Sequence, residues 1–276
     1  MSKRYSPQEI KRANIVYHTR MADSYNKDQP YFSPENVKRV EAIIKNLAKT
    51  CGSSSLLDIG CGTGFIIDIA KRYFKRVAGV DITRAMIDKV DLSAGNINLI
   101  VADISAMPFE DESFDVCTAY GVLHHLPELG STFREIFRCL KKGGVFYADQ
   151  DQNYYCREKI YRLKKGKYSD VLQSEIDSVQ GVFNELKEKY NLDAHTAKLA
   201  EFQNLVCRGI KEEALVSSLK KTGFNEVNFQ YQWFLGQGFV LHNVSEKAAR
   251  DVEAHLKKLL PLSRDLFKYF SFVAKK

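Results

Sequence analysis

The chain has 276 residues, of which 45% are hydrophobic and 27% charged, the balance of an ordinary globular protein and not of a disordered one. No apolar run approaches the roughly 18–20 residues that a membrane span requires, so no transmembrane segment is expected. The net charge of +7 could favour binding to an acidic acceptor, an anionic membrane surface or RNA, although most such excess Lys and Arg residues simply lie on the solvated surface.

Six cysteines are scattered along the chain, and no two of them form a C-x-x-C pair. This spacing indicates neither a disulfide framework nor a zinc site, so free thiols in a reducing compartment are expected. The N-terminal sequence MSKRYSPQEIKR also lacks the apolar core of a secretory signal. We therefore expect a cytoplasmic protein with no bound metal.

Residues 1–50 are predicted to form two helices, separated near residues 29–34 by Pro30 and Pro34. The second helix begins at Pro34, carries apolar residues at helical spacing and should pack on a sheet. The first helix carries Tyr17 and His18, and its plainest interpretation is an amphipathic cover.

A buried strand, a tight turn and a helix start are predicted in LLDIGCGTGF, residues 56–65. The alternating glycines avoid a Cβ where the turn is tight or where a ligand lies against the backbone. The helix start behind them offers unpaired N–H groups to an anionic ligand group. The spacing G-x-G-x-G is neither the dinucleotide fingerprint nor the P-loop, so the loop alone does not specify the ligand.

Further apolar runs occupy residues 77–80, 97–101, 114–120 and 145–148, and polar residues follow closely at their carboxyl ends. Asp81 follows the run at 77–80, and Asp103 comes shortly after the run at 97–101. The alternation of such runs with helical patterns predicts a parallel sheet with helices on both faces. A ligand should then lie outside the carboxyl ends of the strands, where the strand order reverses.

In family order, the motifs LLDIGCGTG, VDIT, ADISAMPF, FDVCTAYGVLHHL and LKKGG resemble those of class I S-adenosylmethionine (SAM)-dependent methyltransferases, in their small-molecule, ubiquinone-biosynthesis-like branch. The resemblance extends from about Ser55 to Asp149. It implies a Rossmann-like α/β fold whose sheet is mostly parallel with an antiparallel last strand. It also implies SAM as cofactor and S-adenosylhomocysteine as product, but leaves the acceptor open.

The resemblance also assigns cofactor roles to residues at the strand ends. Asp81 would accept both ribose hydroxyls, Asp58 would organise the loop and the amino group, and Asp103 would accept from the adenine amine. The pattern Met21–Tyr25 resembles a segment that closes over the cofactor, which makes Tyr25 a candidate to bind the SAM carboxylate and places Tyr17 or His18 in the active-site ceiling. The implied cofactor residues are Tyr25, Asp58, Gly60, Cys61, Gly62, Gly64, Asp81, Ile82, Met86, Asp103, Ile104 and Tyr120.

Four residues are candidates for acid–base chemistry. His124 and His125 follow the fourth strand, and histidine can take a proton from an acceptor hydroxyl near neutrality. The same pattern recurs in the family among enzymes with different acceptors, which favours a structural or cofactor-side role. Asp149 and Asp151, at the expected end of the fifth strand, are alternatives, and a polar turn is their plainer interpretation.

We expect one domain, residues 1–276, with an N-terminal helical cover (1–50) and a cofactor-binding core (55–150). A helical lid insertion (154–209), with Gly181 as a possible helix break, should follow the fifth strand. Its basic residues and tyrosines could bind RNA or lipid headgroups, although a solvated helix face is the plainer interpretation. Residues 210–276 should complete the core, with a smaller insertion at 236–262 that contains a loop or short strand at 236–243 and then a helix capped by Ser245.

The expected function is methyl transfer from SAM to an O, N or C nucleophile of a small or medium organic acceptor, possibly a lipid, quinone, sugar or secondary metabolite. Two alternatives remain open, an RNA-modifying methyltransferase and a noncatalytic SAM-binding partner protein. The expected partner is a small molecule and not a nucleic acid, with at most weak contact to a membrane surface. The sequence does not indicate an oligomeric state.

Overall fold

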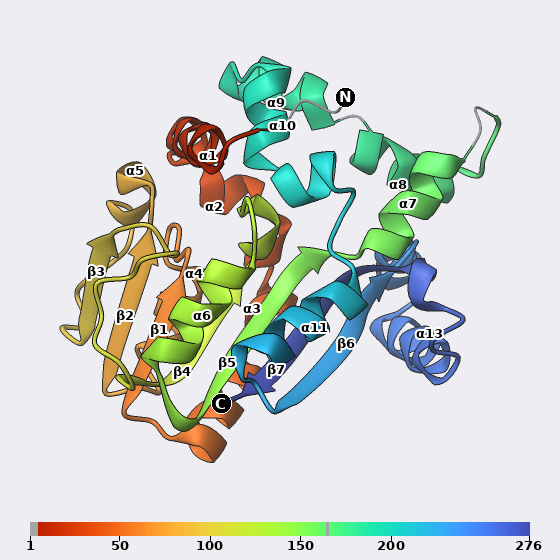
Figure 1. The fold of residues 1–276 in the computed structure, drawn as a ribbon. Coiled ribbons are helices and arrows are strands. Elements are labelled where there is room, and N and C mark those ends of the chain that lie inside the picture. Colours follow the sequence, from red (N-terminus) through yellow and green to blue (C-terminus); the bar gives the residue numbers. More distant parts are fainter. Residues whose placement is uncertain (1–4, 164–165, 181) are drawn as a thin grey trace.

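A seven-stranded sheet forms the centre of the computed structural model, which describes residues 5–163, 166–180 and 182–276 (Figure 1). Its strand order is β3-β2-β1-β4-β5-β7-β6. The strands are β1 (Ser55–Ile59), β2 (Arg76–Asp81), β3 (Ile97–Val101), β4 (Phe114–Tyr120), β5 (Leu140–Gln152), β6 (Glu226–Phe234) and β7 (Phe267–Lys275). The first five pair in parallel, and β7 runs antiparallel between β5 and β6. The expected mostly parallel sheet with an antiparallel last strand is therefore confirmed.

Helices cover both faces of this sheet, because successive strand residues point to opposite faces. Leu56 packs in a cluster with residues of α3 (Pro34–Cys51) and α4 (Phe65–Ala70). Its neighbour Leu57 packs in a second cluster with residues of α6 (Gly130–Cys139) and α11 (Glu212–Thr222). The strand order reverses between β1 and β4, so a crevice opens at the carboxyl ends of these two strands.

The N-terminal segment forms a roof above that crevice. Helix α1 (Pro7–Met21) begins at Ser6, whose side chain accepts from the Glu9 N–H while the Glu9 carboxylate accepts from the Ser6 N–H. Two short helices follow, α2 (Tyr25–Asp28) and η1 (Pro30–Phe32), before α3 begins at Pro34 as expected. Helix α1 packs against a later helix, α10 (Ala194–Ala200), and against α5 (Arg84–Ile87).

Residues 154–209 form helices beyond the carboxyl edge of β5 (Figure 1). Tyr17 and Met21 of α1 share a buried cluster with Leu186 and Tyr190, so this segment supports the roof from outside. The predicted helix break at Gly181 lies outside the described residues. Besides α10, the elements are α7 (Tyr154–Arg162), α8 (Asp170–Gln180), α9 (Val182–Tyr190) and the π-helical turn η3 (Phe202–Val206).

Two local expectations were wrong. The strand expected over residues 145–148 begins earlier, at Leu140, which pairs with Phe114, so residues 141–144 also belong to β5. Residues 236–243, expected as a loop or strand, contain α12 (Gln237–Asn243), which packs against α13 (Glu246–Lys258). The Ser245 cap of α13 is confirmed, and η4 (Arg264–Leu266) leads into β7.

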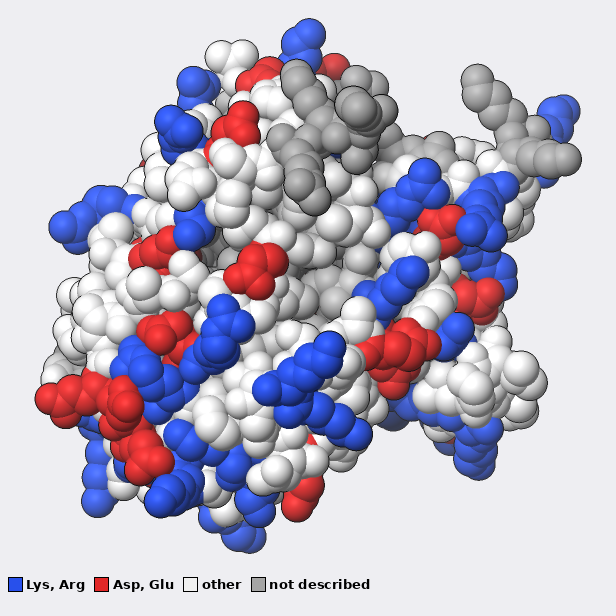
Figure 2. All heavy atoms as spheres, in the orientation of Figure 1, with Lys and Arg blue, Asp and Glu red and all other residues white. Residues whose placement is uncertain are grey.

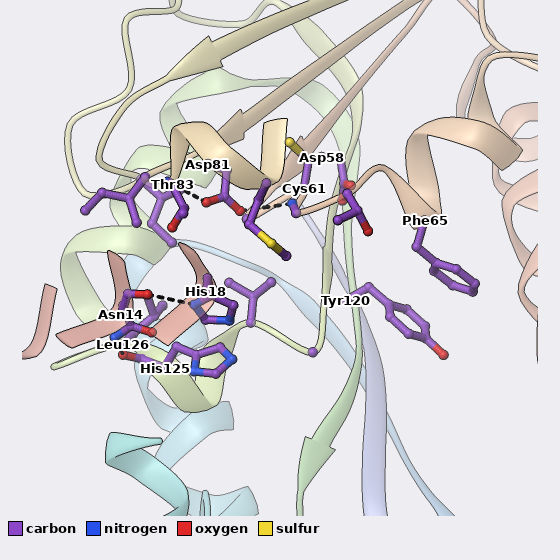
Figure 3. A pocket seen from close by; sticks show the side chains of 18 of the residues that line it. Asn14, His18, Asp58, Cys61, Phe65, Asp81, Thr83, Tyr120, His125 and Leu126 are labelled. Carbon is purple, nitrogen blue, oxygen red and sulfur yellow. Dashed lines mark hydrogen bonds between the residues drawn. The ribbon is translucent and has the colours of Figure 1, made fainter. Parts of the chain in front are cut away.

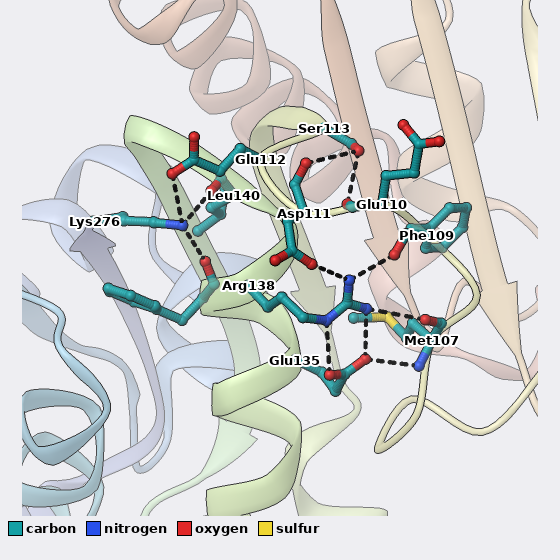
Figure 4. Close-up of polar contacts among 11 residues, drawn as sticks. Met107, Phe109, Glu110, Asp111, Glu112, Ser113, Glu135, Arg138, Leu140 and Lys276 are labelled. Carbon is teal, nitrogen blue, oxygen red and sulfur yellow. Dashed lines mark hydrogen bonds and ion pairs between the residues drawn. The ribbon is translucent and has the colours of Figure 1, made fainter.

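Arg138 of α6 fixes the loop that joins β3 to β4 (Figure 4). Its guanidinium donates to the carbonyl oxygens of Met107 (3.0 Å) and Phe109 (2.6 Å) and to the Asp111 carboxylate (2.8 Å). Glu135 accepts from Arg138 and from the Met107 N–H (2.9 Å). The loop that carries the expected adenine-binding residues is therefore tied to the scaffold.

In the part of the chain that the structure describes, no helix is both long and apolar enough to cross a membrane. On the face drawn in Figure 2, Lys and Arg side chains are interspersed with Asp and Glu. This distribution is that of a solvated surface of mixed charge. The short helix η2 (Leu123–His125) lies between β4 and α6.

Candidate cofactor and active site

A cavity of about 880 Å³, measured with its open mouth, lies at the carboxyl ends of β1, β2 and β4 beneath α1 (Figure 3). It is the place where the sheet topology predicts a ligand. Every expected cofactor residue except Gly64 lines it, namely Tyr25, Asp58, Gly60, Cys61, Gly62, Asp81, Ile82, Met86, Asp103, Ile104 and Tyr120.

The glycine turn is held in shape by Asp81. Its carboxylate accepts from the backbone N–H of Gly62 (2.9 Å) and of Thr83 (2.8 Å), one on each oxygen. Each carboxylate oxygen keeps a further lone pair for a ligand hydroxyl. Gly60 has φ +62°, and a Cβ there would lie 2.7 Å from both Cγ atoms of Val122. Only glycine fits that position without moving a neighbour.

Gly64 does not line the cavity. It is the N-cap of α4 with φ +94°, and a Cβ there would lie 3.0 Å from a Cγ atom of Val90. Glycine is favoured at this position because the turn into the helix requires a positive φ.

Asp58 is buried at the end of β1 and accepts from the Thr118 hydroxyl (2.6 Å). Burial disfavours the charged carboxylate and raises its pKa to about 7, although the Thr118 hydrogen bond acts in the opposite direction. A cation bound beside this carboxyl group would therefore stabilise its ionised form and lower its pKa.

Aromatic side chains form the wall near η1. The Tyr31 ring contacts those of Tyr25, Phe65 and Tyr120, and the ring centroids of Phe65 and Tyr120 are 4.7 Å apart. Burial raises the pKa of Tyr25 to about 12, so its hydroxyl stays protonated at neutral pH. A protonated phenol can donate to a ligand carboxylate, the role expected for Tyr25.

Three residues of α1 enter the cavity from the roof: Lys11, Asn14 and His18. Lys11 contacts the Asp103 carboxylate and donates to Ser105 Oγ (3.2 Å). Lys11 and Asn14 were not predicted, although their spacing with His18 (i, i+3, i+7) places all three on one helix face. His18 was expected in the ceiling and lies there, whereas Tyr17 points away to Glu201.

The expected acid–base residues separate into two groups. His125 lines the cavity, and its Nδ1 lies 2.8 Å from the Ala200 carbonyl oxygen (Figure 3). His124 is outside the lining, with its Nδ1 2.8 Å from Asp151 Oδ1, which also accepts its backbone N–H (3.0 Å). Of these two histidines, the structure therefore brings His125 to the cavity lining and leaves His124 outside it.

The expected position of Asp149 was wrong. Strand β5 continues to Gln152, so Asp149 and Asp151 lie within the strand and are fully buried. Arg39 of α3 donates to Asp149 (2.9 Å), and the Tyr147 hydroxyl contacts the same carboxylate oxygen. Asp149 is thus a neutralised carboxylate of the interior and does not line the cavity.

A sheet of this order, with a glycine turn after its first strand and a carboxylate ending its second, suits a nucleoside ligand at the switch point. Residues 57–148 match the family described as "Methyltransferase domain". A probable S-adenosylmethionine-dependent methyltransferase of Mycolicibacterium smegmatis is 30% identical over 119 residues, 42% of this chain and 46% of that protein. A demethylmenaquinone methyltransferase of Roseiflexus castenholzii is 39% identical over 103 residues, 35% and 41% of the two chains.

Among solved structures, Haemonchus contortus phosphoethanolamine N-methyltransferase 2, in complex with phosphomonomethylethanolamine and S-adenosylhomocysteine, shares the fold with a TM-score of 0.55 at 18% identity. The match covers all of this chain (100%) and 61% of that one. The chain spans less than half the length of the two curated relatives above. The family match over residues 57–148 confirms the resemblance to SAM-dependent methyltransferases found in the motifs of that segment.

Proposed function

We propose that this protein transfers a methyl group from SAM to an oxygen, nitrogen or carbon nucleophile of a small or medium organic acceptor, such as a lipid, quinone, sugar or secondary metabolite. The observation that carries the proposal is the cavity at the switch point, framed by Asp58, the turn at residues 60–62 and Asp81. The Roseiflexus relative is named for a quinone substrate, which supports an acceptor of this kind.

The lining has unused hydrogen-bonding capacity that suits a nucleoside. Asn14 Oδ1 and Thr83 Oγ1 are buried, line the cavity and have no hydrogen-bond partner among the described residues. Buried polar atoms are rarely left unpaired, so a ligand that pairs with them should bind favourably. Gly60 and Gly62 leave room for that ligand against the backbone, because neither carries a Cβ.

When bound, SAM supplies a methyl carbon that its sulfonium has already activated, so the protein's main task is alignment. We assign Asp58 to the ligand's amino group, Asp81 to the ribose hydroxyls and the Tyr25 hydroxyl to the carboxylate. His125 is the candidate to accept a proton from the acceptor. Its Nδ1 must donate to the Ala200 carbonyl, which leaves the Nε2 lone pair available.

The acceptor end of the cavity lies near η2, where Val122, Leu126 and Pro127 contribute apolar lining. Such walls suit an acceptor with a nonpolar part. We further propose that the chain is one domain in which residues 154–209 act as a lid through α1, since no described residue of this range lines the cofactor cavity itself. The cytoplasmic location expected from the six scattered cysteines remains part of this proposal.

The test is transfer of labelled methyl from SAM by the purified protein to a panel that includes quinols, sterols, acyl carriers and amino alcohols. Formation of S-adenosylhomocysteine is the second readout. We expect transfer to at least one class, and none by Asp81→Ala. A wild-type protein that bound no SAM would overturn the proposal, and one that bound SAM but methylated no acceptor would indicate the noncatalytic alternative.

A further inference from the structure

Two imidazoles and a carboxylate converge beside the cavity. His124 and His125 belong to η2, and Glu201 lies at the junction of α10 and η3. One ligand atom of each of these residues lies within 4.8 Å of those of the other two. His124 Nε2 and Glu201 Oε2 are 3.7 Å apart. The methyl-transfer assignment given above leaves His124 and Glu201 without a role.

Both rings are oriented by a second set of contacts. The Nδ1 atom of His124 is paired with Asp151, and that of His125 with the Ala200 carbonyl. A carboxylate or a carbonyl oxygen can only accept, so each Nδ1 carries a proton, and in the neutral ring each Nε2 keeps its lone pair. Donation of the outer ring N–H to a carboxylate or backbone carbonyl is the usual support of a metal-ligating histidine.

The carboxylate is held as well. Glu201 Oε2 accepts from Asn204 Nδ2 (2.8 Å), and Glu201 Oε1 accepts from the Tyr17 hydroxyl (3.3 Å). Its side chain is 16% exposed, and that of His124 is 12% exposed. The three groups therefore form a partly enclosed set whose positions are fixed from outside.

A further histidine lies next to the set. The His18 ring centroid is 4.7 Å from that of His125, and its Nδ1 is 3.0 Å from the Asn14 carbonyl oxygen. The same argument leaves its Nε2 unprotonated. Since His18 and His125 both line the cofactor cavity, the set borders the space where the acceptor would lie.

We propose that His124, His125 and Glu201 bind one divalent first-row transition-metal ion, with an open coordination position towards the cavity. Imidazole nitrogens suit zinc, iron, cobalt and nickel, whereas magnesium and calcium prefer all-oxygen ligands. Two histidines and one glutamate with a vacant position are also the donor set of zinc sites that bind an exchangeable ligand. A bound ion would occupy the His125 Nε2 lone pair, so in the metal-bound protein that atom could not also accept a proton from the acceptor.

Zinc is the probe. The full chain is treated with EDTA, dialysed and titrated calorimetrically with zinc chloride, and cobalt chloride gives a visible spectrum that reports the ligand field. We expect one equivalent of tightly bound ion. His124→Gln, His125→Gln and Glu201→Gln should each weaken zinc binding by at least about tenfold.

Two matched variants control for other donors. His255→Gln changes a histidine of α13, and Cys207→Ser removes the exposed thiol nearest in sequence to the proposed site. Both should bind zinc like the wild type. Absence of saturable binding, wild-type affinity in the three ligand variants, or loss of the ion in Cys207→Ser would each overturn the proposal.

A crystallographic measurement avoids the question of whether the variants fold. Crystals of the wild-type protein grown with zinc should show an anomalous difference peak between the three side chains. A peak only at other residues would contradict the proposal. SAM binding measured on the same preparation separates the two proposals, since a protein that binds SAM but no zinc refutes only the metal site.

Discussion

Asp58 allows a pH experiment on the wild-type protein. Burial raises the pKa of this carboxyl to about 7. If the carboxylate binds the amino group of SAM, the ligand binds only the ionised form, and lowering the pH should weaken binding. With a pKa near 7, about one tenth of the carboxyl is ionised near pH 6 and about half near pH 7, so SAM affinity should fall about fivefold between the two. That change corresponds to about 1 kcal/mol.

The assay is isothermal titration with SAM near pH 6 and near pH 7 at constant ionic strength. An α-amino group of pKa about 7.7–8.0 stays protonated over this range, so the ligand contributes little to the slope. Asp58→Asn cannot ionise and should bind more weakly, with almost no pH dependence. A wild-type protein without the pH effect, or an Asn variant that kept it, would refute the reasoning.

The same carboxyl should also affect the stability of the ligand-free protein, with the sign opposite to that of a salt-bridged acid. The pKa of Asp58 is higher in the folded protein than in the unfolded chain. As the pH rises from about 4 to about 7, the unfolded chain ionises this carboxyl first, so the folded protein loses stability over that range. In thermal unfolding experiments, the stability of Asp58→Asn relative to the wild type should therefore increase as the pH rises over this window. A constant difference would mean that the carboxyl is not protonated in the folded state.

Three further predictions concern the cavity and its roof. Asp81→Ala removes the acceptor for two ribose hydroxyls and should cost about 2–4 kcal/mol of SAM affinity by calorimetry, with wild-type affinity in a folded variant as the contrary result. Gly60→Ala places a Cβ against Val122 and should lower both SAM affinity and the unfolding temperature, whereas loss of neither would show that the turn can relax. Replacing residues 154–209 with a short linker should weaken SAM binding more than about tenfold, because α1 loses its packing partner α10; retained affinity would show that the roof holds without the lid.

The cofactor half of the site could be predicted from the sequence because its residues follow strand ends directly. Asp58 closes β1 and Asp81 closes β2, and parallel strands bring their carboxyl ends to one edge whatever the rest of the chain does. The turn of Gly60 is likewise local, since a single backbone conformation requires it.

The rest of the site depends on contacts between segments that are distant in the sequence. The periodicity of apolar residues predicts helices and strands but not these contacts. Asp149 was placed at a strand end because its apolar run stops there, but pairing with β7 extends β5 beyond it. Glu201 meets the histidines only because α10 packs against α1, and Lys11 reaches Asp103 only because α1 crosses the cavity. No signal in the sequence near Glu201 distinguishes it from a solvated helix residue.

The roof has a consequence for turnover. Helix α1 packs against α10 and α5 and contributes no strand or ladder to the sheet, and its Lys11 contacts Asp103 across the cavity mouth. A nucleoside that leaves past α1 must separate that ion pair, so by this route the residence time of the demethylated product would depend on roof opening as well as on contacts in the pocket. Both partners of the pair are about one-third exposed (28% and 34%), so added salt should screen it and speed exchange. If product release limits turnover, the turnover rate at saturating substrate would then rise with ionic strength until contacts in the pocket, and no longer the ion pair, limit product release.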